Sequence, residues 1–444
     1  MGVAQLQETS QFAGLRQFVQ ILTMESLARV GEDGRMQPWL AESWTTEENG
    51  RIIRVKLRPG VKFSDGSILD AKTVAEILAT SIGEFIGPLS EDLDTITPSG
   101  TGQVEIRFKR PSNLHVEALE TTITKPGKQP IGTGAYVPVG DTELRASADY
   151  YLGKPSIERI VVSNYPSLRT AWAEALRGNL DLLYDVSTDA LDSLDRSTTI
   201  STHIVARRYQ HVVVLNSKAP ALHSVETRRA LNNLIDRTVF VKSALNGYGT
   251  PSSGPIWPHY WALPPVSVEP HHSDSVAPFR SKLTFTCLVD SGDERIALEV
   301  KRQLAAFGID MKTESVSRDQ IHKRVADGAY DAALVELISG PTFLRPYMIW
   351  YTKGAINLGK FGNSTIDAAL ERAHNAEGEE DFKKAVAGVQ RAFQDDPPAI
   401  FLAWNQRARA VSNRFVVPPS EPGRDILSTL RAWRPVDAAQ AGRN

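Results

Sequence analysis

Residues 38–74 read PWLAESWTTEENGRIIRVKLRPGVKFSDGSILDAKTV and predict three elements in close succession. Apolar and basic residues alternate from Arg51 to Leu57, which is the pattern of a half-buried strand. The Asp65-Gly66 pair predicts a tight turn, because glycine adopts a positive φ at low cost. Asp70 can accept a hydrogen bond from the first free N–H groups of a following helix. The stretch therefore predicts a strand, a hairpin and a capped helix, and it contains no chemically reactive group.

The composition of the chain is that of a globular protein with several domains. Its 444 residues exceed one ordinary core, so two or three domains are expected. Hydrophobic residues make up 41% and charged residues 23%, which is too rich in core formers for a disordered chain. The net charge of −2 gives no support to nucleic acid as a partner, which would favour a basic face. Cys287 is the only cysteine, which excludes an intrachain disulfide and a cysteine-based zinc cluster.

The N-terminal residues MGVAQLQETSQ have neither the basic nor the apolar region of a secretion signal. No apolar run reaches the roughly 18 to 20 residues needed to cross a bilayer. The composition and the N-terminus together leave two alternatives: a cytoplasmic protein, or an exported protein whose signal is not part of this sequence.

Strand and helix patterns alternate along the rest of the chain. Apolar residues at helical spacing predict helices at 15–30, 168–176, 225–245, 293–307, 320–326, 366–373 and 382–393. Apolar runs and alternations predict strands at 102–109, 144–148, 159–164, 180–184, 205–216, 283–289, 309–316, 331–337 and 399–404. Asp293 is expected to cap the helix that it begins. This alternation favours an α/β fold with a largely parallel sheet.

A series of motifs resembles the family 5 extracellular solute-binding proteins, the receptors of ABC importers for peptides, nickel and related solutes. The quoted stretch resembles the signature region of that family, and further matches follow in the same order. The motifs are Glu25 to Leu27, Pro38 to Trp44, Leu57 to Gly66, Asp70 to Val74, Gly132 to Tyr136, Tyr150 to Pro155, Gly178 to Asp181, Val225 to Arg237, Asn357 to Ala373 and Ala399 to Trp404.

The resemblance implies an α/β fold of the two-lobe, type II periplasmic-binding-protein class, with a small extra subdomain in lobe I. The segment between Gly66 and Gly132 is shorter than usual for the family, so this subdomain is expected to be reduced. The expected limits are 1–216 for lobe I, about 45–130 for its subdomain, 217–410 for lobe II, 411–444 for the return to lobe I, and crossovers near 216–217 and 407–411.

The function implied by the resemblance is capture of a small solute between the lobes and delivery to the permease subunits of an ABC importer. The solute is expected to be peptide-like, a sugar or an anionic conjugate. We further expect a periplasmic or extracellular monomer that needs no cofactor and no metal, binds no nucleic acid and is not an enzyme.

Ten residues are predicted to contact the ligand, because the resemblance places them at strand ends and crossovers that face the cleft. They are Tyr184, Asp185, Tyr209, His211, Ser339, Thr342, Phe343, Arg345, Trp404 and Asn405. In the peptide receptors of the family, an Asp in the loop matching Ser339 to Arg345 holds the ligand's α-amino group. No acid occurs in this loop here, which lowers the expectation of a free peptide, while Arg345 would suit a carboxylate.

Several of these residues have simpler alternative roles. Core packing is an equal alternative for Phe343 and Trp404, and a surface position is the alternative for Asp185 and Arg345. On the proline-rich stretch 254–278, Trp257, Tyr260 and Trp261 either pin the chain to a lobe or line the rim of a cleft.

Other chemistries have weaker support. A hydrolase on the same scaffold, using Asp185 and His211, is the alternative function, but no hydrolase signature supplies a nucleophile. His271-His272, with His259 nearby, could suggest a metal, although a solvated pair is favoured. Gly354 to Lys360 has the spacing of a P-loop, but Phe361 replaces the required Ser or Thr.

Overall fold

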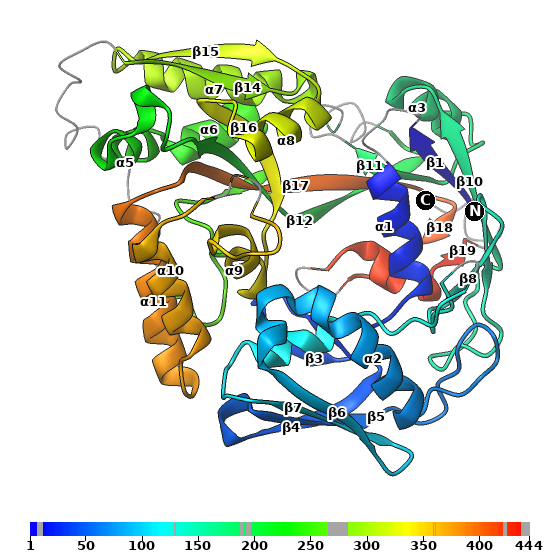
Figure 1. Ribbon diagram of the computed structural model, residues 1–444. Helices are drawn as coiled ribbons and strands as arrows, with labels where there is room; N and C mark the ends of the chain where they lie inside the picture. Colours follow the sequence, from blue (N-terminus) through cyan, green and yellow to red (C-terminus); the bar gives the residue numbers. More distant parts are fainter. Residues whose placement is uncertain are drawn as a thin grey trace.

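The structure of the protein is a computed structural model that describes residues 1–6, 12–127, 130–186, 191, 197–264, 283–357, 359, 361–420 and 424–436. An 11-stranded sheet in the order β15-β14-β16-β12-β17-β11-β1-β10-β9-β8, with β13 paired to β17, runs through both halves of the molecule (Figure 1). Its strands are β1 (Gly2–Leu6), β8 (Tyr136–Val139), β9 (Glu143–Ala146), β10 (Arg159–Tyr165), β11 (Leu182–Val186), β12 (Ile200–Leu215), β13 (Gly249–Pro251), β14 (Thr284–Val289), β15 (Asp310–Ser315), β16 (Ala332–Ile338) and β17 (Ala399–Ser412).

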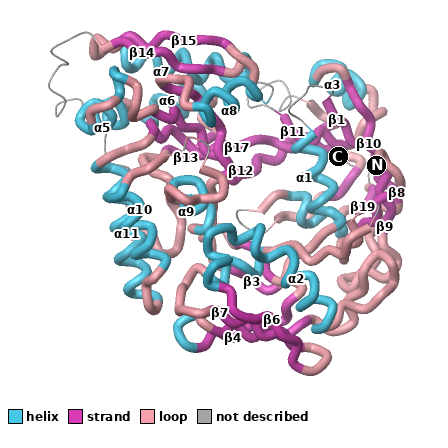
Figure 2. Tube along the Cα trace, viewed as in Figure 1, coloured by secondary structure: helices cyan, strands magenta, loops and turns pink. Residues whose placement is uncertain are grey.

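Three smaller sheets and the helices complete the fold, and Figure 2 shows helices and strands in both halves of the molecule. The smaller sheets are β4 (Ala41–Glu47), β5 (Ile52–Leu57), β7 (Gln103–Phe108) and β6 (Leu93–Ser99); β2 (Ala28–Val30) with β3 (Met36–Pro38); and β18 (Phe415–Val416) with β19 (Arg434–Pro435). The α-helices described are α1 (Phe12–Thr23), α2 (Ala71–Ile86), α3 (Leu168–Leu176), α5 (Val225–Asn233), α6 (Arg237–Ala244), α7 (Glu294–Ala305), α8 (Arg318–Asp327), α9 (Leu344–Trp350), α10 (Ser364–His374) and α11 (Glu379–Asp395). The 3-10 helices used below are η2 (Gly87–Asp92), η3 (His115–Glu120) and η8 (Ile426–Ala432).

The main sheet is mixed, so the prediction of a largely parallel sheet was wrong. Strand β1 is parallel to β10 and β11, and β14 is parallel to β15 and β16. The remaining pairs, including β12 with β17, are antiparallel. Two parallel units are therefore joined by two long antiparallel strands, and Figure 1 shows β12 and β17 running between them.

Alternating side chains of β12 bury both faces of the sheet. Val213 and Leu215 pack in the core that includes α5, α6 and α7, whereas Val212 and Val214 pack in the core that includes α9, α10 and α11. A strand covered on both sides has no polar face, which explains the continuous apolar run at its end.

The stretch 38–74 forms the predicted elements. In β5, Ile53, Val55 and Leu57 are buried and the basic residues between them are exposed. The carboxylate of Asp70 accepts a hydrogen bond of 2.8 Å from the backbone N–H of Thr73 and caps α2. The predicted strand and the predicted helix cap are confirmed.

The predicted helix at 225–245 is two helices, which corrects the sequence prediction. Asp236 caps α6 by accepting from the N–H of Val239. The buried guanidinium of Arg237 donates to the carbonyls of Asn232 and Ile235 at 2.8 and 3.2 Å, and also to Ser252 and Phe401. Those carbonyls at the end of α5 are satisfied by a side chain, so the helix ends there.

Four further predictions of local structure needed correction. The predicted helix at 15–30 ends at Thr23, after which Ala28–Val30 forms β2. The side chain of Asp293 makes no capping hydrogen bond at the start of α7. The last strand continues from the predicted 399–404 to Ser412, and α9 was not predicted.

Gly132 and Gly134 allow the chain to pass directly against the end of α1. A Cβ atom at Gly132 would lie 2.1 Å from the carbonyl oxygen of Thr23, and one at Gly134 would lie 2.4 Å from that of Leu22. These neighbours are backbone atoms, which cannot turn aside as a side chain can. The Gly-Thr-Gly motif is therefore required by close backbone packing.

We predict that Gly134→Ala lowers the free energy of unfolding by about 2–3 kcal/mol, because the added methyl group overlaps backbone atoms. The measurement is urea unfolding followed by circular dichroism. Gly102→Ala is the matched control, since a Cβ there has nothing within 4 Å, and it should shift stability by less than about 0.5 kcal/mol. Equal stability of the two variants would contradict this account of the motif.

Candidate functional site

A cavity of about 720 Å³ lies between the two halves of the sheet, a volume suited to a small solute. Its wall includes residues of β11, β12 and β17, the end of α1, the segment from Met24 to Trp39, the loop from Ile338 to Arg345 and the C-terminal segment from Arg424 to Arg431. Segments distant in sequence thus share one wall.

Six aromatic side chains line this cavity: Trp39, Tyr150, Tyr184, Tyr209, Trp257 and Trp404. Trp257 and Trp404 meet edge to face with ring centroids 5.0 Å apart, and Trp404 is only 1% exposed. The indole N–H of Trp404 has no hydrogen-bond acceptor among the described residues. The wall therefore offers flat aromatic surface, while the indole nitrogen of Trp404 is itself buried.

Arg409 is a charged residue of the wall that has several partners. Its guanidinium donates to the carboxylate of Asp425 at 2.7 and 3.1 Å and to the backbone oxygen of Tyr184, and it lies 4.0 Å from the centroid of the Tyr184 ring. Arg409 is 4% exposed, so its charge is buried and neutralised by Asp425. Its contacts hold the C-terminal segment against β11.

Arg345, another arginine of the wall, has fewer partners than Arg409. It lines the cavity from α9, is half-buried, and its guanidinium carbon lies 5.6 Å from the centroid of the Phe85 ring. Among the described residues, no carboxylate or other acceptor bonds to its guanidinium. A guanidinium in this setting is suited to bind an anionic acceptor.

Glu25 is a buried carboxyl group in the wall. Its oxygens accept hydrogen bonds from Tyr150 at 2.7 Å, Thr133 at 2.8 Å and Tyr151 at 3.2 Å. Burial outweighs these hydrogen bonds and raises the pKa of Glu25 to about 7. The cluster joins three of the sequence motifs, those at 25–27, 132–136 and 150–155.

The sequence and the fold are both similar to those of known proteins. The family model for bacterial extracellular solute-binding proteins, family 5 (middle), matches residues 35–358, which is well over half of the chain. The protein belongs to this family. It is a solute-binding protein of an ABC importer, and its predicted family, fold class and general function are confirmed.

Individual relatives are distant in sequence but similar over their whole length. The oligopeptide-binding protein AppA of Bacillus subtilis is 22% identical over 92% of this chain and 85% of its own. The crystal structure of that protein with a nonapeptide superposes with a TM-score of 0.77 at 20% identity, covering 98% of this chain and 99% of that one. NikZ from Campylobacter jejuni, in complex with Ni(L-His), gives a TM-score of 0.79 at 20% identity with the same coverage.

Five of the ten predicted site residues line the cavity of this solute-binding protein: Tyr184, Tyr209, Thr342, Arg345 and Trp404. Tyr184 and Tyr209 come from the main sheet, and Thr342 and Arg345 from the loop that lacks the expected acid. Whether these residues contact the ligand stays a prediction.

The structure places the other five outside the cavity wall, each with partners of its own. Phe343 is fully buried against Tyr260 and Phe382, which is its alternative role as core. Ser339 donates to the backbone oxygen of Pro255. Asn405 donates to Glu336 at 2.6 Å, the carboxylate that also lies 3.9 Å from His211. Asp185 lies 3.9 Å from Arg409.

The proximity on which the hydrolase alternative rested is not observed. Asp185 lies beside Arg409 of β17, whereas His211 pairs with Ala403 of β17. Ala403 precedes Arg409 by six positions along that strand. At about 3.3 Å per residue, the two side chains are on the order of 20 Å apart. The candidate acid and base therefore cannot act on one bond.

Sequence reasoning missed several wall residues. Glu25 belongs to a quoted motif, but a lone Glu within the predicted helix at 15–30 carries no signal of burial. Trp257 lines the cavity, as in the cleft alternative, while Tyr260 is buried against Phe343, as in the alternative that the aromatics pin the chain to a lobe. Arg424 and Asp425 come from the C-terminal segment, and only the fold brings them to the wall. His271-His272 lies outside the described residues.

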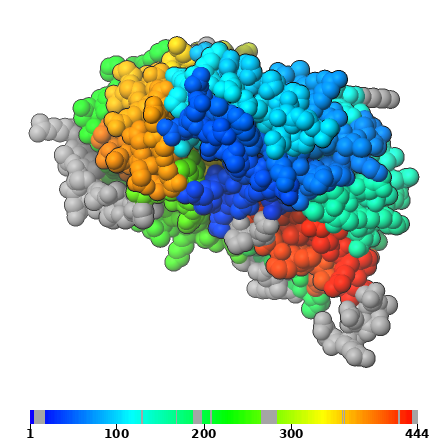
Figure 3. Space-filling view, turned by 90° about the horizontal axis from the view of Figure 1, so that it is seen from below, coloured from blue at the N-terminus to red at the C-terminus, as the bar shows by residue number. Residues whose placement is uncertain are grey.

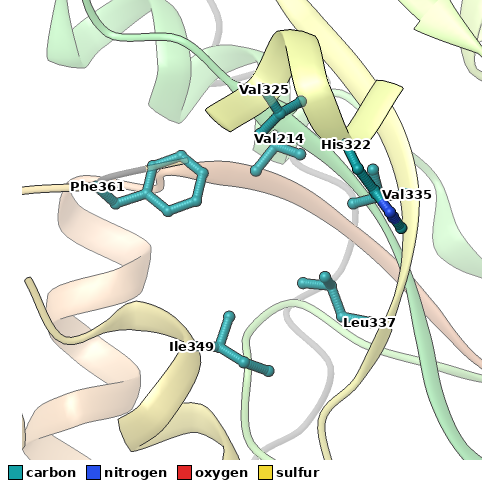
Figure 4. A pocket seen from close by; sticks show the side chains of 7 residues that line it. All are labelled: Val214, His322, Val325, Val335, Leu337, Ile349 and Phe361. Carbon is teal, nitrogen blue, oxygen red and sulfur yellow. The ribbon is translucent and has the colours of Figure 1, made fainter. Parts of the chain in front are cut away.

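A second cavity formed by described residues is too small for a solute, and none of the described helices could span a membrane. This apolar cavity lies among Val214, His322, Val325, Val335, Leu337, Ile349 and Phe361, and its volume of about 10 Å³ has room for about one water molecule (Figure 4). Over the described part of the chain, no helix has both the length and the apolar character to cross a bilayer.

The raised pKa of Glu25 predicts a pH dependence of stability. The proton held in the folded state favours folding below pH 4.5, and this contribution is lost as the pH rises through about 7. The difference amounts to about 3 kcal/mol. Glu25→Gln keeps a neutral hydrogen-bonding group, so its unfolding free energy should fall less than that of the wild type between pH 5 and 8.

Urea unfolding at a series of pH values measures this difference. Glu76→Gln, which removes an exposed carboxylate on α2, is the control and should keep the wild-type pH profile. An unchanged profile for Glu25→Gln would show that Glu25 takes up no proton on folding.

Proposed function

We propose that the cavity captures a small solute carrying a carboxylate or a comparable anionic group, and that Arg345 binds this group. The observation that carries the proposal is the contrast between two arginines of one wall. Arg409 is neutralised by Asp425, while Arg345 has no acidic partner among the described residues. A half-buried cation without a counter-ion is stabilised when a ligand supplies one.

The rest of the wall supports a solute with a flat apolar part. The aromatic side chains offer stacking surface to such a solute. The loop from Ser339 to Arg345 supplies no carboxylate for a free amino group. Anionic conjugates, acidic sugars and short peptides with a blocked amino group are therefore favoured.

Closure around the solute requires two segments that bend. We propose that they are the middle of β12, near 205–210, and of β17, near 404–408, where the register of the β12–β17 pair shifts. This would move the first crossover about ten residues before the predicted position at 216–217. Affinity would then depend on how strongly the ligand stabilises the closed arrangement.

We also propose that the protein acts as an exported monomer in the periplasm or outside the cell, and that it neither binds nucleic acid nor turns over its ligand. The family supports binding and delivery to a permease, and the near-neutral net charge of −2 supports the absence of a nucleic-acid partner.

The proposed role of Arg345 predicts a loss of affinity in Arg345→Gln. Native mass spectrometry of freshly purified protein would first identify a carried-over solute, which isothermal titration calorimetry would then test. Loss of a charge-assisted pair costs about 1.5–3 kcal/mol, so affinity for a carboxylate-bearing solute should fall roughly 10- to 150-fold.

Arg318→Gln, at the start of α8 and outside the cavity wall, is the matched control and should bind like the wild type, because Arg318 is half-buried as Arg345 is but lies 3.9 Å from Asp293. If Arg345→Gln binds the anionic solute as tightly as the wild type does, or if only cationic solutes stabilise the protein, the proposal fails.

A further inference from the structure

Outside the cavity, Asp92, His115 and His374 meet in a buried cluster. They are 4%, 1% and 2% exposed, and their candidate ligand atoms all lie within 4.8 Å of one another. Asp92 ends η2 and His115 begins η3, whereas His374 is the last residue of α10. Figure 3 shows the orange α10–α11 region against the blue and cyan N-terminal region, so the cluster joins two separate parts of the fold.

One carboxylate oxygen faces both imidazoles. Oδ2 of Asp92 lies 2.6 Å from Nε2 of His374 and 3.4 Å from Nε2 of His115. The other oxygen, Oδ1, accepts a hydrogen bond of 2.5 Å from Nε of Arg110. The two imidazole nitrogens and Oδ2 therefore converge, while Oδ1 is occupied by the arginine.

The hydrogen bonds of His115 determine which of its nitrogens is protonated. Nδ1 lies 3.1 Å from the backbone oxygen of Gly50, and a carbonyl oxygen only accepts, so Nδ1 carries the proton. In the neutral ring, Nε2 then presents a lone pair to a carboxylate oxygen. This contact of 3.4 Å is favourable when Nε2 is protonated as well, or when a cation lies between the two atoms.

The surroundings of the cluster are those of histidines that bind a metal. A ligand histidine typically donates its second N–H to a backbone carbonyl or another oxygen, as His115 does to Gly50. For His374, the hydroxyl of Tyr347 lies 3.4 Å from Nδ1 and can accept its proton. Nη2 of Arg110 is also 3.4 Å from Nδ1, but this side chain is 46% exposed and can turn towards Asn375, to which it already donates.

We propose that Asp92 Oδ2, His115 Nε2 and His374 Nε2 form a site for one divalent transition-metal ion, with Zn²⁺ as the best match. Two imidazoles and one carboxylate are a common ligand set for this ion, with water in the fourth position. The cation takes the place of the proton that His374 shares with Asp92. None of the three residues lines the solute cavity, so the site is independent of the proposed function.

The consequence of binding would be mechanical. The ion would tie the end of α10 to the region of the four-stranded sheet, where Ser112 and Asn113 already bond to the backbone of His374, Ala376 and Gly378. Because the ligands come together only in the folded chain, Zn²⁺ would stabilise the native state.

The test uses the full-length, tag-free chain after dialysis against a chelator, with ZnCl₂ as the probe. Isothermal titration calorimetry should show one Zn²⁺ per chain, and the thermal unfolding midpoint should rise with Zn²⁺ concentration. CoCl₂ should give the visible absorption bands of Co²⁺ in a low-coordinate nitrogen and oxygen site. Absence of stoichiometric Zn²⁺ binding by the wild type would overturn the proposal.

Variants assign the binding to these residues. Asp92→Asn and His374→Gln should each weaken Zn²⁺ binding at least about 10-fold and abolish the Co²⁺ spectrum. The double variant His271→Gln/His272→Gln removes the other paired histidines of the sequence and should bind like the wild type. Two results would overturn the assignment. One is loss of Zn²⁺ binding in the double variant while Asp92→Asn and His374→Gln still bind. The other is unchanged Zn²⁺ affinity in Asp92→Asn. Circular dichroism of each variant separates loss of the site from loss of the fold.

Discussion

The antiparallel pairing of β12 with β17 is the interaction on which the rest of the structure depends. It extends from Ile200 paired with Ser412 to Val214 paired with Ala399, and it joins the two parallel units of the sheet. At one end β12 also pairs with β16, and at the other β17 pairs with β11. The register shifts between Ala206 and Gln210, and irregular pairing of this kind re-aims side chains. The cavity lies at that irregular centre, lined by side chains from both strands.

Polar contacts then fix the walls of the cavity to one another. Glu25 draws Thr133, Tyr150 and Tyr151 together, and the glycines beside Thr133 let the backbone approach the end of α1. Arg409 binds Asp425 and the backbone of Tyr184, which attaches the C-terminal segment to β11. Buried polar groups of this kind stabilise a fold only when each has its partners. The first and last parts of the chain are thus held at one site.

The charges of the wall differ in role because they differ in partner. Arg409 has a carboxylate within hydrogen-bonding distance, so its charge is part of the scaffold. Arg345 has an aromatic ring but no acidic partner among the described residues, which is the basis of the proposal that its charge binds a ligand. His211 also has an acidic neighbour, Glu336, and it is not among the residues that line the cavity.

The sequence by itself determined the local elements and the family. Alternation in β5, the cap at Asp70 and the ordered motifs depend on residues close in sequence, so they could be recognised without a fold. The break between α5 and α6 could not be recognised in this way, because Arg237 donates hydrogen bonds to Ser252 and Phe401, which are distant in sequence. The wall of the cavity likewise depended on tertiary structure. Phe343 and Arg345 are two residues apart, yet one is fully buried and the other faces the cavity, because neighbours from distant segments decide which side chains are covered and which charges are neutralised.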